Sequence, residues 1–143
     1  MASAGKVEIH PEIRKMYEEV QVHLKNIREI QTKRTKFIET RHQLGAQKNE
    51  NDLVRDELNR LEDGAGVYKL IGPALISQDR EDAKSIVEKR LEFINDQVKR
   101  VEANINQCDK EEATDSDKVV ALQQKMQVRQ NQLVAEQQKR GGN

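Results

Sequence analysis

The sequence has little of the material from which compact cores are built. Only 3% of its 143 residues are aromatic and 35% are hydrophobic, while another 35% are charged. Globular domains are typically about 45–50% apolar and about 25% charged. The length allows one compact domain, but the apolar residues available for its core are few. No run approaches the roughly 18 apolar residues of a transmembrane helix, so we expect no membrane association.

The sequence also shows no excess of either charge, no second cysteine and no pattern of a signal peptide. Its 25 basic and 25 acidic residues cancel, which argues against a nucleic-acid binder, because such proteins usually carry a basic excess. Cys108 is the only cysteine, so no internal disulfide can form, and residues 1–6 lack the apolar stretch of a signal peptide. We therefore expect a cytoplasmic protein, which could also be nuclear.

Proline and glycine are nearly absent from two long stretches. Gly45 is the only such residue in 12–63, and there is none in 74–140; half of the others gather in 64–73. This distribution predicts two long helices around a short irregular or β segment, all within a single domain over 1–143. The predicted elements are a helix over about 8–62, a β-hairpin over about 66–78, a helix over about 81–138 and a disordered tail at 139–143.

Apolar residues in the second stretch repeat at alternating spacings of four and three. A sustained heptad of this kind is typical of a coiled coil and argues against full disorder, which would show no periodicity. Two of the positions are acidic, Glu112 and Asp115. The seam positions are Val87, Leu91, Ile94, Val98, Val101, Ile105, Cys108, Glu112, Asp115, Val119, Leu122, Met126, Arg129 and Leu133.

The first stretch follows the same rule with more polar interruptions, at His23, Arg34 and Arg41. Its apolar seam positions are Ile13, Met16, Val20, Ile27, Ile30, Phe37 and Leu44, and then, in a shifted register, Val54, Leu58 and Leu61. The shift predicts a stutter near residues 45–51. Because each seam needs an apolar partner, the two helices should fold back on each other as an antiparallel pair.

Antiparallel pairing about the central segment brings together residues whose numbers sum to roughly 143. Glu112 and Asp115 then face residues 28–34, which predicts a charged layer with Arg34 as its basic member. The alternative is that these side chains lie at the edge of the seam and reach water.

The central segment consists of two short apolar runs with Gly72 and Pro73 between them, which predicts a β-hairpin. Gly72 can take the positive φ of the first central position of a type II′ turn, so Ile71 should face Ala74. One face then carries Val67, Ile71, Ala74 and Ile76, and the other carries Tyr68, Leu70 and Leu75.

Both faces of this hairpin are apolar, and two helices cannot cover both. A lone two-stranded hairpin is marginal in water and has open edges. We therefore expect strands from other chains to complete it; the alternative is a plain loop between helices. The oligomerisation residues predicted here are Val67, Tyr68, Leu70, Ile71, Gly72, Pro73, Leu75 and Ile76.

The chain shows no pattern of an active site or cofactor site. Gly64 and Gly66 lack the remaining residues of a phosphate-binding loop, so we expect no use of ATP. His10, His23 and His42 are too far apart in sequence for a helical metal pair. We therefore expect that the protein is not an enzyme and binds no cofactor or metal. Cys108 should serve as a small apolar residue of the seam.

Three segments resemble the β-class subunits of prefoldin, the cytosolic co-chaperone: residues 51–58 (NDLVRDEL), 67–73 (VYKLIGP) and 89–94 (KRLEFI). The resemblance implies a mainly α fold in which two long antiparallel coiled-coil helices flank one hairpin, and the hairpin joins an inter-subunit β-barrel. It implies a heterohexamer of two α-class and four β-class subunits. Such a complex works without ATP, holds unfolded clients such as actin and tubulin at its coiled-coil tips, and delivers them to the cytosolic chaperonin.

In that arrangement the client-binding tip joins the start of the first helix to the end of the second. Apolar side chains at the two ends would offer an adaptable surface. The alternative for the seam members of this set is ordinary burial between the helices. The candidate tip residues are Val7, Ile9, Ile13, Met16, Tyr17, Met126, Val128, Leu133 and Val134.

Two other functions fit the helices. A coiled-coil scaffold or tether would need the helices but not the apolar hairpin. A subunit of a prefoldin-like assembly complex would need both, and the sequence does not separate it from prefoldin itself.

Overall fold

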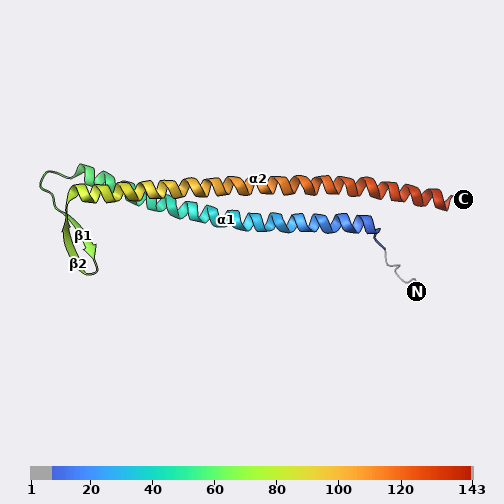
Figure 1. The fold of residues 1–143 in the computed structure, drawn as a ribbon, viewed down its shortest axis with the longest axis horizontal. Coiled ribbons are helices and arrows are strands. Elements are labelled where there is room, and N and C mark those ends of the chain that lie inside the picture. The colour runs from blue at the N-terminus through green and yellow to red at the C-terminus, as the bar shows by residue number, and fades with distance from the viewer. Residues whose placement is uncertain (1–7, 143) are drawn as a thin grey trace. The chain divides into compact units, whose positions relative to one another are not determined.

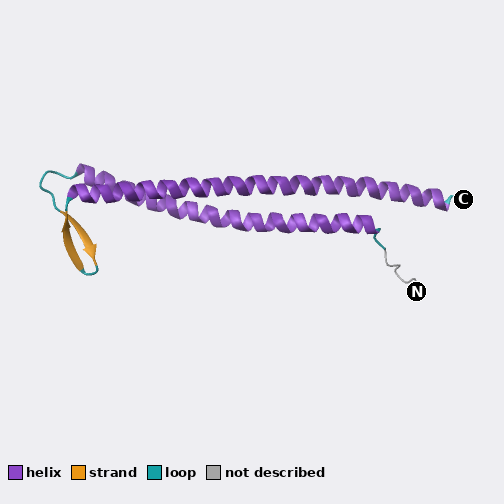
Figure 2. Cartoon of the chain, viewed as in Figure 1, coloured by secondary structure: helices purple, strands orange, loops and turns teal. Residues whose placement is uncertain are grey.

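The computed structural model describes residues 8–142. The chain forms α1 (Pro11–Arg60), β1 (Val67–Ile71), β2 (Ala74–Gln78) and α2 (Arg80–Gly141), in that order (Figures 1 and 2). The prediction of a mainly helical chain with one antiparallel hairpin between two long helices is confirmed.

The ends of the helices differ from the predicted ones. Helix α1 begins at Pro11 rather than near residue 8. Proline is suited to the first helical position, and the His10 side chain caps the first turn of the helix. Helix α2 continues to Gly141, so the residues 139–141 assigned to a disordered tail are helical. Lys139 and Arg140 lie in its last turn, where positive charge stabilises a helix end.

The chain divides into two compact units. Unit 1 consists of Met1–Lys33 with Gln107–Asn143, and unit 2 of Arg34–Asn106. Unit 1 thus contains the first part of α1 and the last part of α2, and unit 2 contains the hairpin with the adjoining helix ends (Figure 1). The single domain over 1–143 stays a prediction.

The heptad of α2 is confirmed by burial. Its apolar positions from Val87 to Cys108 are buried, apart from the half-buried Val98, and Val119 continues the buried row. Glu112, Asp115 and the later seam positions are half-buried. The repeat therefore describes one face of α2, which is apolar except for Glu112, Asp115 and Arg129 in unit 1.

The shifted register predicted for the end of α1 is wrong at Val54. Asn51 and Arg55 are half-buried and, with the buried Leu58, lie at positions of the register that starts at Ile13, although Lys48 of that register is exposed. Val54, which the shifted register placed in the seam, is 44% exposed. Polar side chains fill seam positions here, so a search for apolar residues alone followed the wrong row.

A small apolar core in unit 2 joins the hairpin to the helices. Leu58 of α1 packs with Ala83, Val87 and Leu91 of α2, and Leu61 and Val67 pack against this cluster. The Arg80 guanidinium also donates a hydrogen bond to the backbone carbonyl of Glu62. These contacts hold the base of β1 beside the two helix ends.

The hairpin has the predicted register and turn. Ile71 pairs with Ala74, Lys69 with Ile76, and a two-residue connection joins the strands. Gly72 has φ of 57°, a conformation that costs a glycine little but is unfavourable for residues with a Cβ. With Pro73 restricted to negative φ, this is the pattern of the type II′ turn.

Candidate assembly and client-binding surfaces

Both faces of the hairpin are exposed in the described chain. Tyr68, Leu70 and Leu75 share one face and are 62%, 68% and 69% exposed. Ile71 and Ile76 lie on the other face and are about half exposed. Neighbouring apolar side chains that face water on both sides of a two-stranded ribbon indicate a surface that another chain covers.

A tyrosine and a glycine shape one side of this hairpin in a way that the sequence pattern did not show. The Tyr68 ring lies so close to Gly66 that a Cβ built on Gly66 would be 2.9 Å from the ring. Val54, Val67 and Tyr68 also line a hollow of about 180 Å³ between the hairpin and the helices. Val54 therefore faces the hairpin instead of the helix seam.

The candidate tip residues fall into three groups. Ile9, Tyr17, Val128 and Val134 are exposed, at 53%, 54%, 57% and 43%. Ile13, Met16, Met126 and Leu133 are half-buried in the seam. Val7 lies outside the described residues. The first group is accessible as it stands, while the second becomes accessible only if the helices separate.

Two hollows lie between the helices in this part of unit 1. One, of about 340 Å³, is lined by Ile13 and Met126 together with Gln123, Gln127 and Gln130. The other, of about 620 Å³, has Ile9, Ile13, Leu133 and Val134 in its lining, together with charged residues. Ile13 borders both hollows. The structure thus brings together most of the described tip residues predicted from the two ends of the chain.

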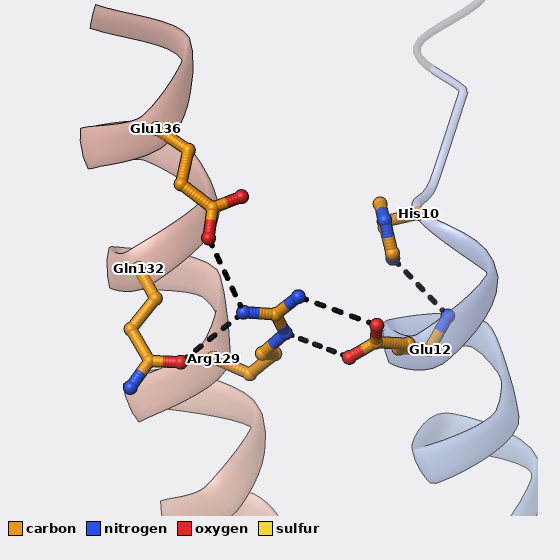
Figure 3. A network of polar contacts seen from close by, with 5 residues as sticks. All are labelled: His10, Glu12, Arg129, Gln132 and Glu136. Atoms are coloured by element: carbon orange, nitrogen blue, oxygen red, sulfur yellow. Dashed lines mark hydrogen bonds and ion pairs between the residues drawn. The ribbon is translucent and has the colours of Figure 1, made fainter. Parts of the chain in front are cut away.

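A charged network connects the helices beside these hollows (Figure 3). Arg129 Nε and Nη2 donate hydrogen bonds to the two carboxylate oxygens of Glu12, at 2.7 and 3.3 Å, and Nη1 donates to Gln132 Oε1 at 3.2 Å. Glu136 lies 3.7 Å from the same guanidinium. The hydrogen bonds from Arg129 hold the pKa of Glu12 below its usual value, and they raise the pKa of Arg129.

The helix start beside Glu12 is capped by a side chain. The backbone N–H of Glu12 donates to His10 Nδ1 at 3.2 Å. This satisfies one of the N–H groups that the first turn of a helix leaves without a partner. Neither this cap nor the Glu12–Arg129 contact was predicted; the seam position of Arg129 was visible in the heptad, but its partner was not.

A polar layer crosses unit 1 at the acidic seam positions. His23 Nδ1 lies 2.9 Å from Asp115 Oδ1, and Gln31 Nε2 donates to Glu112 Oε1 at 2.9 Å. A charged layer opposite residues 28–34 was predicted here; the partner of Asp115 is instead His23, and that of Glu112 is the neutral Gln31, while a role for Arg34 stays a prediction. The His23 and Asp115 side chains are only 22% and 16% exposed.

Breaking the His23–Asp115 contact from one side should destabilise unit 1. Asp115→Leu leaves the imidazole half-buried without its partner, and we expect a loss of about 1–3 kcal/mol in the free energy of unfolding. The double variant His23→Leu with Asp115→Leu should recover most of that loss, because it removes both polar groups. Urea unfolding followed by circular dichroism measures both; equal losses in the single and double variants would contradict the coupling.

Among the described residues, no three histidine, cysteine, aspartate or glutamate side chains are grouped so as to hold a metal ion. None of the described helices is apolar over a length that could cross a bilayer. Cys108 is a free thiol, 2% exposed in the seam of α2.

The arrangement of two long helices and one central hairpin matches a known family. A family model described as a prefoldin subunit matches residues 21–132. The chain belongs to the prefoldin subunit family. A probable prefoldin subunit 6 of Caenorhabditis elegans is 40% identical over 102 residues, which cover 71% of this chain and 81% of that protein. Human prefoldin subunit 6 is 31% identical over 108 residues, covering 76% and 84%.

A solved structure supports the fold. The crystal structure of the prefoldin beta subunit from Thermococcus strain KS-1 superposes with a TM-score of 0.58 over 80% of this chain and 94% of that one, at 14% identity. The predicted membership of the prefoldin family and the likeness to β-class subunits and to prefoldin subunit 6 are confirmed. Prefoldin subunits are chaperone-type proteins that assemble with other prefoldin subunits.

Proposed function

We propose that this chain is a β-class subunit of a heterohexameric co-chaperone that holds unfolded proteins without ATP. Its hairpin joins an inter-subunit β-barrel with α- and β-class prefoldin subunits. Its paired helices hold clients such as unfolded actin and tubulin at their tip, and the complex delivers them to the cytosolic chaperonin. On this proposal the protein acts in the cytoplasm.

The single observation that carries this proposal is the hairpin exposed on both faces. Leu70 and Leu75 stand opposite each other and are both more than two-thirds exposed. Each leucine that another chain covers contributes about 1.5–3 kcal/mol if it becomes fully buried. Strand edges on both sides remain open for hydrogen bonds to a neighbouring hairpin.

The client-holding part of the proposal is supported by the exposed apolar side chains at the tip. Ile9 and Val134 come from opposite ends of the chain and border the same hollow. Such a surface binds many apolar sequences weakly, and several subunits acting on one client gain through multivalency.

The hairpin supports this proposal over a plain scaffold or tether, which would have no use for apolar strands facing water. A prefoldin-like complex with another task remains the second candidate, because it would use the same hairpin. The partners that copurify with the chain separate these two.

Serine at Ile9 and Val134 should weaken client holding by the assembled complex about three- to tenfold, because the hollow loses apolar area from both helices. The measurement is light scattering from a chemically unfolded protein, such as actin, diluted into the complex with and without ATP. The wild-type complex should suppress aggregation equally in both conditions.

The matched control is Val22→Ser, since Val22 is 58% exposed on α1 but does not line either hollow. It should leave holding unchanged. Equal losses in the control and the tip variant, or suppression that requires ATP, would argue against the proposed function.

A further inference from the structure

We propose that the Glu12–Arg129 ion pair is a clasp that keeps the tip closed over Ile13, Met126 and Leu133. When the clasp opens, these side chains bind an apolar, uncharged segment of an unfolded polypeptide. The inference rests on the proposed client-holding function and adds to it a device that controls access to the binding surface.

The position of Arg129 in the heptad is the first support. It occupies a seam position of α2, three residues after Met126 and four before Leu133, where an apolar side chain would close the seam. Its guanidinium instead reaches across to both oxygens of Glu12 (Figure 3). A bidentate contact of this kind fixes geometry as well as distance. The Glu12–Arg129 ion pair therefore connects the two helices at the seam position where apolar packing is interrupted.

The second support is how easily this bridge could open. The Arg129 and Glu12 side chains are 27% and 50% exposed, and ion pairs open to water stabilise a protein little. Further along the same helix pair the seam is tight, since Val20 and Val119 are 5% and 7% exposed. Separation of the helices should therefore start at the clasp and stop before these two valines.

The third support is what lies on either side of the clasp. Ile13 borders both hollows, so separating the helices should join them into one groove with Ile13, Met126 and Leu133 in its lining. Acidic Glu8 and Glu136 and basic Arg129 and Arg140 balance around the larger hollow. The amides of Gln123, Gln127 and Gln130 line the smaller one. Balanced charge favours no charged ligand, and amides can donate to and accept from an extended backbone.

The test uses the assembled complex with Glu12→Gln in this chain, and Glu18→Gln as the matched control on an exposed acid of α1. Hydrogen exchange by mass spectrometry over residues 11–20 reports opening directly, without a client. Light scattering from an unfolded protein reports holding. Both are measured at low and high ionic strength, because salt screens an exposed ion pair.

We expect Glu12→Gln to raise exchange in residues 11–20 about two- to fivefold at low salt, the range for losing an exposed pair. Client holding should rise by a similar factor. Salt should reproduce both effects in the wild type and add little in the variant. Arg129→Gln should behave as Glu12→Gln does, and Glu18→Gln should behave as wild type.

Unchanged exchange in both clasp variants would overturn the clasp. Faster exchange with unchanged holding would overturn its control of client access, while leaving the proposed function intact. A wild-type complex that holds no client, with exchange responding as expected, would overturn the proposed function and not the opening itself.

Discussion

A chain carrying Leu70→Glu with Leu75→Lys should fail to assemble with other prefoldin subunits, although its helices stay folded. The two residues are directly opposite on one hairpin face, so the introduced charges attract each other and the hairpin itself is maintained. The change removes two apolar side chains of 68% and 69% exposure from the surface that a neighbour would cover. Losing both burials weakens assembly by a factor on the order of a hundred or more.

Size-exclusion chromatography with light scattering measures this loss on the coexpressed subunits, and circular dichroism checks the helices. Val22→Glu is the control, because Val22 is exposed to a similar extent but belongs to unit 1, whereas the hairpin belongs to unit 2. Normal assembly by the hairpin variant would show that other parts of the chain hold the complex together. Failure of both variants would point to a general effect of surface charge.

The second large effect concerns the core that joins the hairpin to the helices. Leu91→Ala should lower the free energy of unfolding by about 2–4 kcal/mol, because Leu91 is 3% exposed and its truncation leaves a cavity beside Leu58 and Val87. Phe93→Ala, two residues further along α2, should change it by less than about 0.5 kcal/mol, because the ring is 64% exposed.

Urea unfolding of the purified chain, followed by circular dichroism, measures both variants. The two variants discriminate well because phenylalanine is the larger side chain. If side-chain size alone determined the loss in free energy of unfolding, Phe93→Ala would have the larger effect. A larger loss for Phe93→Ala than for Leu91→Ala would contradict the assignment of the helix seam.

The elements that the sequence predicted best are those in which one local rule suffices. The heptad of α2 has apolar side chains at successive seam positions from Val87 to Cys108, so its buried face could be read directly. The hairpin register followed from Gly72 and Pro73, because a positive-φ glycine followed by a proline fits the two central positions of a type II′ turn. The apolar character of both hairpin faces was equally visible.

The errors came from positions where polar side chains take the place of apolar ones. Asn51 and Arg55 are half-buried near the end of α1, whereas Val54, which the search for valine and leucine placed in the seam, is exposed. Arg129 was placed in the seam, but its pairing with Glu12 depends on side-chain reach across the helices. Periodicity reports which face a residue occupies and not which long polar side chain it meets.

Native mass spectrometry of the complex, purified from cells through a tag on this chain, tests assembly through the hairpin most directly. We expect a hexamer of six related coiled-coil chains with one copy of this chain, and only smaller species when the hairpin carries Leu70→Glu and Leu75→Lys. A homodimer or an unpartnered chain would contradict assembly through the hairpin and would favour a coiled-coil scaffold.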